Sequence, residues 1–163
     1  MPVRPILLLP NPLLRQTAPP ADWAAPDTAR VIQDLWDTLD SHVGVGLAAP
    51  QIGESLRAIV VDATRARRPA ANHGRLALLN PRILLAEGRI SFREGCLSVP
   101  DLVAHISRAE RVAVAALAPD GSPLTIEAEG FEAVILQHEI DHLNGQLFID
   151  RVRRARDLKP RSA

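Results

Sequence analysis

The sequence predicts an α+β fold in which antiparallel sheets pack around a central, buried helix near the C-terminus. Two stretches with apolar residues at helical spacing, 27–42 and 131–143, enclose a region of short β-prone runs separated by turn signals. The second stretch is apolar on more than one face. Strands in series followed by one buried helix favour antiparallel sheet with the helix packed against it.

A first helix is expected after Pro26, at the end of a proline-rich segment. Asp27 is the expected N-cap, because its carboxylate can accept a hydrogen bond from a free N–H group of the first turn. The helix should end near His42. Its apolar residues recur at spacings of three and four: Val31, Ile32, Leu35 and Leu39.

Five strands are expected in the middle of the chain, at residues 58–61, 76–79, 89–92, 111–117 and 124–128. The last two should form a hairpin, because Pro119, Asp120 and Gly121 between them are typical turn residues. The basic, alanine-rich segment 64–74 is expected to be a surface loop.

A second helix is expected from Phe131 to about Leu143, where Asn144 and Gly145 form a usual C-terminal signal. Its apolar residues occupy two sides, which indicates a largely buried helix. One side carries Phe131, Val134 and Ile135, and the other carries Leu136, Ile140 and Leu143.

Length and composition indicate one domain, residues 1–163, with a short basic tail at 151–163. The single cysteine excludes an internal disulfide. Nineteen basic and nineteen acidic residues give zero net charge, which argues against nucleic acid as the main partner. Because the chain has no apolar run of the length that a signal peptide or transmembrane helix needs, we expect an intracellular protein with no membrane partner.

The second helix carries the pattern H-E-x-x-H at His138, Glu139 and His142. At 100° per residue the two histidines lie about 40° apart on one face, so they can bind one metal ion with the carboxylate beside it. Ordinary core or capping histidines are the alternative. Burying two unpaired histidines and an acid in an apolar helix would be costly, which favours the metal site.

Cys96 is the best candidate for a third ligand, since catalytic metal sites usually have three protein ligands and an open position. It follows a predicted strand and the small residue Gly95. The alternative is a small buried hydrophobic residue.

Segment 44–51 indicates a close backbone approach or a tight turn, and it lacks the setting of a dinucleotide loop. Within it, Gln51 could donate a hydrogen bond to an oxyanion, or it could be structural.

Three segments together resemble the peptide deformylase family: G-x-G-L-A-A-x-Q at 44–51, E-G-C-L-S at 94–98 and Q-H-E-x-D-H at 137–142. The resemblance implies removal of the N-formyl group from the methionine of new bacterial or organellar polypeptides, in the cytoplasm for a bacterial protein. It also implies a ferrous ion bound by one cysteine and two histidines. The metal ligands would then be Cys96, His138 and His142.

The resemblance makes Glu139 the general base and lets Gln51 and the backbone N–H of Leu97 bind the formyl oxygen. The backbone around Gly46 would pair with the peptide. Helical geometry places three apolar residues on the ligand face, where with Val45 they would form a slot for methionine, although core packing is the alternative. These residues are Phe131, Val134 and Ile135. Asp141 and Arg108 could form a pair that steadies the helix, or an unrelated surface pair.

Two positions depart from the family pattern. Val103 stands where many members carry an arginine that contacts the peptide beyond methionine, and Asp40 stands where a tyrosine is frequent. The tail is shorter than the ribosome-docking helix of many relatives. Its arginines could touch ribosomal RNA, although a solvated tail is the expectation. They are Arg151, Arg153, Arg154 and Arg156.

Other functions fit parts of the pattern. A zinc peptidase or another amide hydrolase could use the same carboxylate, but its third ligand usually follows the helix, where this chain has none suitable. A structural metal module usually needs four Cys or His ligands. Two imidazoles and a thiolate suit Zn²⁺, Fe²⁺, Co²⁺ or Ni²⁺, so iron rests on the resemblance alone. We expect a monomer.

Overall fold

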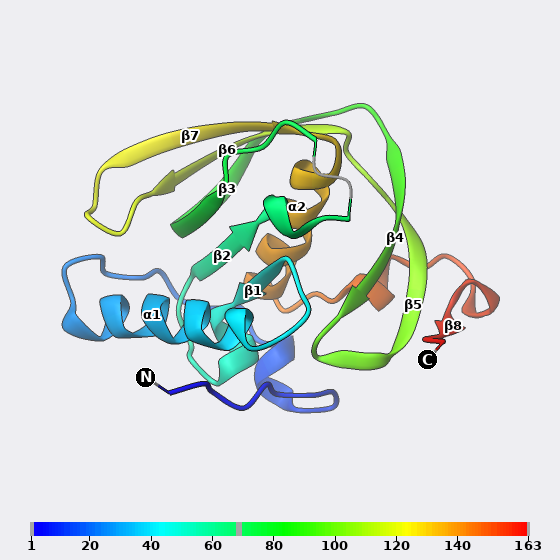
Figure 1. Ribbon diagram of the computed structural model, residues 1–163, viewed down its shortest axis with the longest axis horizontal. Helices are drawn as coiled ribbons and strands as arrows, with labels where there is room; N and C mark the ends of the chain where they lie inside the picture. Colours follow the sequence, from blue (N-terminus) through cyan, green and yellow to red (C-terminus); the bar gives the residue numbers. More distant parts are fainter. Residues whose placement is uncertain (1, 68–69, 163) are drawn as a thin grey trace.

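The computed structural model describes residues 2–67 and 70–162. Figure 1 shows helix α2 (Gly130–Leu143) in the middle of the molecule, with a five-stranded sheet on one side and a hairpin of two strands on the other. The α+β class with antiparallel sheets and a central C-terminal helix is therefore confirmed. Within the described residues, no helix is long and apolar enough to span a bilayer.

The five-stranded sheet has the order β1-β2-β3-β6-β7, and every neighbouring pair is antiparallel. Its strands are β1 (Gly46–Ala48), β2 (Ala58–Asp62), β3 (Arg75–Glu87), β6 (Arg111–Leu117) and β7 (Pro123–Glu129). The predicted hairpin is confirmed, with Val114 opposite Ile126. The strand expected at 76–79 is only the start of β3, which continues through an irregularity at Asn80, a residue with φ of 51°.

The second sheet contains β4 (Ile90–Cys96), β5 (Val99–Arg108) and the short β8 (Lys159–Pro160), in that order. The strand expected at 89–92 is the beginning of β4. Strand β5 was not expected, because Pro100 and Asp101 at its start are uncommon in strands. Cys96 is thus the last residue of β4, opposite Val99.

Helix α1 (Pro26–Asp40) packs against β1 and β2. The prediction of Asp27 as N-cap was wrong: Ala25 is the N-cap, Pro26 occupies the first helical position, and Asp27 lies in the first turn. Proline suits that position, because its missing N–H would have no partner there. At the other end, Asp40 forms ion pairs with Arg65 and Arg75.

Helix α2 matches its predicted bounds to within one residue, and Gly145 follows it with a φ of 73°. Ala133, Leu136 and Leu143 are fully buried. The helix contacts four strands of the first sheet and also β4 of the second, including β1 at one edge and β7 at the other. Coverage on several sides explains why its apolar residues are not confined to one stripe.

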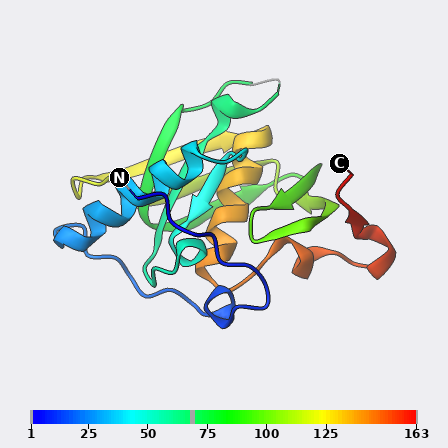
Figure 2. The same cartoon turned by 60° about the horizontal axis from the view of Figure 1, so that its bottom comes forward.

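Most residues of the C-terminal segment are exposed to solvent, as expected of a solvated tail, but the segment folds back on the domain. Arg151 forms an ion pair with Asp141, Arg154 pairs with Asp157, and β8 pairs with β5 at Leu102 and Val103. Figure 2 shows this segment running beside the β4–β5 hairpin to the end of the chain. The segment 64–74 begins as a single 3-10 turn, Ala63–Arg65, and residues 68–69 of that predicted loop lie outside the described residues.

Candidate metal centre

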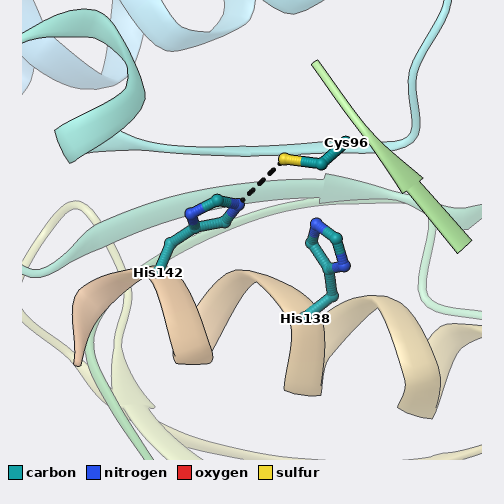
Figure 3. Close-up of side chains that lie close together, drawn as sticks. All are labelled: Cys96, His138 and His142. Atoms are coloured by element: carbon teal, nitrogen blue, oxygen red, sulfur yellow. Dashed lines mark hydrogen bonds between the residues drawn. The ribbon is translucent and has the colours of Figure 1, made fainter. Parts of the chain in front are cut away.

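Cys96, His138 and His142 lie together, with their sulfur and one nitrogen each within 4.8 Å of one another. Figure 3 shows the two imidazoles rising from successive turns of α2 toward the thiol at the end of β4. The Cys96 Sγ and His142 Nε2 atoms are 3.4 Å apart. The two histidines, four residues apart on α2, thus present adjacent rings, and the second sheet contributes the thiol of Cys96.

The donor set fits one metal ion. In a tetrahedral site, a metal–sulfur bond of about 2.3 Å and a metal–nitrogen bond of about 2.1 Å place the sulfur and nitrogen about 3.6 Å apart. The 3.4 Å between Cys96 Sγ and His142 Nε2 is close to this value. Burial lowers the pKa of His142 well below its ordinary value, which keeps that ring in the neutral form that binds metals.

The pKa of His138 shifts the other way. Burial opposes its charged form, but hydrogen bonds to Cys96 and Glu94 together with the charge of Glu139 outweigh burial and raise the pKa well above 6.5. The surroundings of the three donors therefore attract positive charge, as a site for a divalent cation requires.

Glu94 orients His138. Its Oε1 accepts a hydrogen bond of 2.8 Å from Nδ1 of the imidazole, which leaves Nε2 free to face the other donors. Arg108 donates to both oxygens of Glu94, at 2.6 and 2.9 Å, and Arg108 Nη1 donates to Asp141 at 2.9 Å. The expected contact between Asp141 and Arg108 is therefore present, as part of a larger buried network that Arg151 completes.

Sequence reasoning missed Glu94, although it was part of the second motif. Its position two residues before Cys96 was the available signal, because residues i and i+2 of a strand point to the same face. The pairing of β4 with β5 shifts register between Glu94 and Cys96, and both side chains nevertheless contact histidines of α2, Glu94 at His138 and Cys96 at His142. Burial opposes the charged form of Glu94, but hydrogen bonds from His138 and then Arg108 outweigh burial and hold the pKa of Glu94 below its usual value.

Glu139 lies beside the three donors and is 3% exposed. Its Oε2 has no hydrogen-bond partner among residues 2–67 and 70–162. Burial raises its pKa to about 7. A carboxylate in this state can take up and release a proton near neutral pH.

Gln51 directs its amide nitrogen toward the same place. Its Oε1 accepts a hydrogen bond of 3.0 Å from the backbone N–H of Ala48, which fixes the orientation of the side chain. Its Nε2 donates to Ser98 Oγ at 3.1 Å and lies 3.6 Å from Cys96 Sγ. Leu97, the other expected source of a donor, lines the adjoining cavity.

A cavity of about 310 Å³ opens onto the metal centre. All five residues expected to contact the substrate line it: Val45, Gly46, Phe131, Val134 and Ile135. Glu139, His138 and Cys96 also line it. Val43, which is fully exposed, and two arginines, Arg93 and Arg161, also line it.

Comparison with known proteins gives one consistent result. A family model described as polypeptide deformylase matches residues 3–157. A peptide deformylase of Mesorhizobium japonicum is 44% identical over 153 residues, which are 93% of this chain and 85% of the relative.

Solved structures agree with the sequence comparison. The crystal structure of a peptide deformylase from Legionella pneumophila is 43% identical, with a TM-score of 0.85 over 93% of this chain and 86% of the other. The Met-Ala-Ser-bound class I type b peptide deformylase of Acinetobacter baumannii is 34% identical, with a TM-score of 0.87 over 93% of this chain and 99% of the other.

Proposed function

Because this chain belongs to the polypeptide deformylase family, whose metal-dependent members hydrolyse the N-formyl group of formylmethionyl peptides, we propose specific roles for its residues in that reaction. Cys96, His138 and His142 bind the metal ion. Glu139 is the general base and acid, and Gln51 and the backbone N–H of Leu97 bind the formyl oxygen.

The observation that carries this proposal is the cluster of three donors, Cys96, His138 and His142, beside a cavity that two of them line together with the unpartnered carboxylate of Glu139. When bound, a divalent cation supplies Lewis-acid chemistry that polarises a carbonyl and makes water nucleophilic at neutral pH. Iron is the metal that we propose for the native protein. The same donors suit Zn²⁺, Ni²⁺ and Co²⁺, so these ions should also bind.

Glu139 moves the proton. Its Oε2 has no hydrogen-bond partner among the described residues, and its pKa of about 7 suits both directions of transfer. It accepts a proton from the attacking water and returns it to the amine of methionine as the C–N bond breaks. General acid–base catalysis of this kind contributes about 10²- to 10⁴-fold.

Gln51 stabilises the oxygen on which negative charge develops. Its amide is held in place before the substrate arrives, because Ala48 and Ser98 bind its two ends. Preorganised donors are effective in a buried site, where water does not compete with them. Leu97 follows Cys96 directly, so its N–H lies at the same end of the cavity.

The substrate lies between the two sheets. Strand β1 ends the order of the first sheet and β4 ends that of the second, and residues of both line the cavity. An extended peptide can pair with the free edge at Gly46, while methionine enters the apolar side formed by Val45, Phe131, Val134 and Ile135. The Acinetobacter relative was solved with Met-Ala-Ser bound, which supports a short peptide as the kind of ligand for this site.

We further propose that residues 1–163 form one catalytic domain that works as a cytoplasmic monomer on nascent chains. Arg153 and Arg156 are exposed on the C-terminal segment and are available for a transient ribosome contact. Arg151 is also exposed, but its guanidinium is already paired with Asp141.

The test measures formate release from a formyl-Met-Ala-Ser peptide. The acetylated peptide and the peptide with a free N-terminus are tested for hydrolysis as comparison substrates. The protein is prepared without oxygen and loaded with Fe²⁺ or Ni²⁺. We expect rapid release from the formyl peptide alone, lost in Glu139→Ala at unchanged metal content. Cleavage of the unmodified peptide would instead indicate a peptidase, and full activity of the variant would refute the role of Glu139.

A further inference from the structure

Two arginines that line the cavity have no role in the reaction described above. Arg93 comes from β4, and Arg161 comes from the end of the chain, directly after β8. Within residues 2–67 and 70–162, neither side chain forms an ion pair, whereas the nearby Glu94 is already paired with Arg108. The two arginines therefore give the lining of the cavity positive charge that no described carboxylate neutralises in an ion pair.

The C-terminal segment holds Arg161 in place by backbone pairing. Strand β8 pairs with β5 at Leu102 and Val103, and the N–H of Arg161 donates to the carbonyl of Asp101 at 2.9 Å. The position of Arg161 is thus set by three consecutive residues of a strand rather than by a free chain end.

The guanidinium of Arg161 lies against Gly95, the residue next to Cys96. A Cβ on Gly95 would overlap Arg161 Nη2, would lie 3.2 Å from its Cζ and would lie 3.5 Å from Val103 Cγ1. Glycine at 95 and the short side chain of Val103 therefore leave the space that the guanidinium occupies. This arrangement brings a residue more than sixty positions away in sequence to the metal end of the cavity.

We propose that Arg161 is a specificity residue that binds a carboxylate of the substrate one or two residues after formylmethionine. Adjacent Cα atoms are 3.8 Å apart and an extended peptide advances about 3.3 Å per residue, so a cation over Gly95 is one or two peptide residues from the reacting group. The planar guanidinium binds carboxylates through two parallel hydrogen bonds. This inference rests on the proposed function.

The carboxylate can come from an acidic side chain or from the C-terminus of a short peptide. Four peptides distinguish these sources. Two have an amidated C-terminus and differ in one side chain: formyl-Met-Ala-Glu amide and formyl-Met-Ala-Gln amide. The other two are formyl-Met-Ala-Ala with a free C-terminal carboxylate and the same peptide with an amidated C-terminus. The glutamate and glutamine peptides have the same shape, so their ratio of kcat/KM reports the charge alone.

We expect the wild-type protein to prefer each carboxylate peptide over its neutral counterpart by about two- to fivefold, mainly through KM, because Arg161 acts away from the reacting atoms. In Arg161→Gln this ratio should fall to about one, and in Arg161→Glu it should invert. Arg82→Gln, an exposed arginine of β3, is the matched control and should keep the wild-type ratio.

Equal ratios in wild type and Arg161→Gln would overturn the inference, as would a loss of preference in Arg93→Gln alone. A wild-type protein that hydrolyses no formyl peptide would overturn the proposed function instead. In that case the calorimetric affinity of the metal-loaded protein for Met-Ala-Glu amide and Met-Ala-Gln amide still tests Arg161. Equal affinities for the two peptides would refute its role.

Discussion

Gly46 and Glu139 lie so close that a Cβ on Gly46 would be 2.9 Å from Glu139 Cγ and 3.0 Å from Oε1. The edge strand β1 therefore passes directly over the carboxylate that we propose as the base. Gly46 does not have a positive φ, so the reason for a glycine here is the space that the carboxylate occupies.

Gly46→Ala should lower kcat by about 100-fold, because the methyl group displaces the carboxylate and a misplacement of about 1 Å can cost that much. Steady-state rates with the formyl peptide check this expectation. Gly44→Ala is the matched control: its Cβ would lie 3.4 Å from side-chain carbons of Leu39 and Leu97, and its effect should be far smaller. Equal losses in the two variants would contradict the proposed contact.

Gln51→Ala should lower kcat by about 10² to 10³ while the protein still binds one metal ion, because the variant lacks one donor to the developing oxyanion. Metal content is measured on the same preparation as the rate. Gln33→Ala removes an exposed glutamine of α1 and should retain the wild-type rate. If Gln51→Ala kept its kcat and only KM rose, Gln51 would be a ground-state contact instead.

The sequence was sufficient for features that depend on local spacing. His138 and His142 share a helix face because they are four residues apart, and α2 ends where Asn144 and Gly145 indicate. Sequence reasoning missed features that depend on pairing between segments far apart in the chain. Strand β5 forms because β4 covers one of its edges and β8 the other, and Arg161 reaches the cavity only through that second pairing.

The role of Glu94 depended on tertiary structure in the same way. Nothing near it in sequence shows that Arg108 would neutralise it or that His138 would donate to it, since both partners come from other elements. Asp40 was likewise unexplained until the fold placed Arg65 and Arg75 beside it.

Glu94→Gln should weaken metal binding by about 10- to 100-fold, because groups that orient a ligand imidazole contribute about that much to affinity. A glutamine has one acceptor oxygen, whereas Glu94 accepts from His138 and from two nitrogens of Arg108. Competition with a chelator measures the affinity. Glu127→Gln, on the exposed face of β7, is the control with the same change of charge, and a matching loss there would refute the specific role of Glu94.

Asp141 should make folding stability depend on pH in acid. Burial favours its neutral form, but hydrogen bonds from Arg151 and then Arg108 outweigh burial and hold the pKa of Asp141 below its usual 3.8. A carboxyl with a lower pKa in the folded state adds stability above the unfolded value, and this contribution disappears as the pH falls through the folded value. The loss should therefore occur below about pH 4.

Asp141→Asn should remove this dependence and cost about 3 kcal/mol at pH 7, because Arg108 would remain buried with one partner fewer. Urea unfolding of the metal-free protein at pH 7 and pH 3 gives both quantities, and the difference between variant and wild type should shrink at the lower pH. Asp157→Asn breaks the exposed pair with Arg154 and should cost less than about 1 kcal/mol at either pH. A cost for Asp141→Asn that is small, or the same at both pH values, would show that its ion pairs with Arg108 and Arg151 do not stabilise the fold.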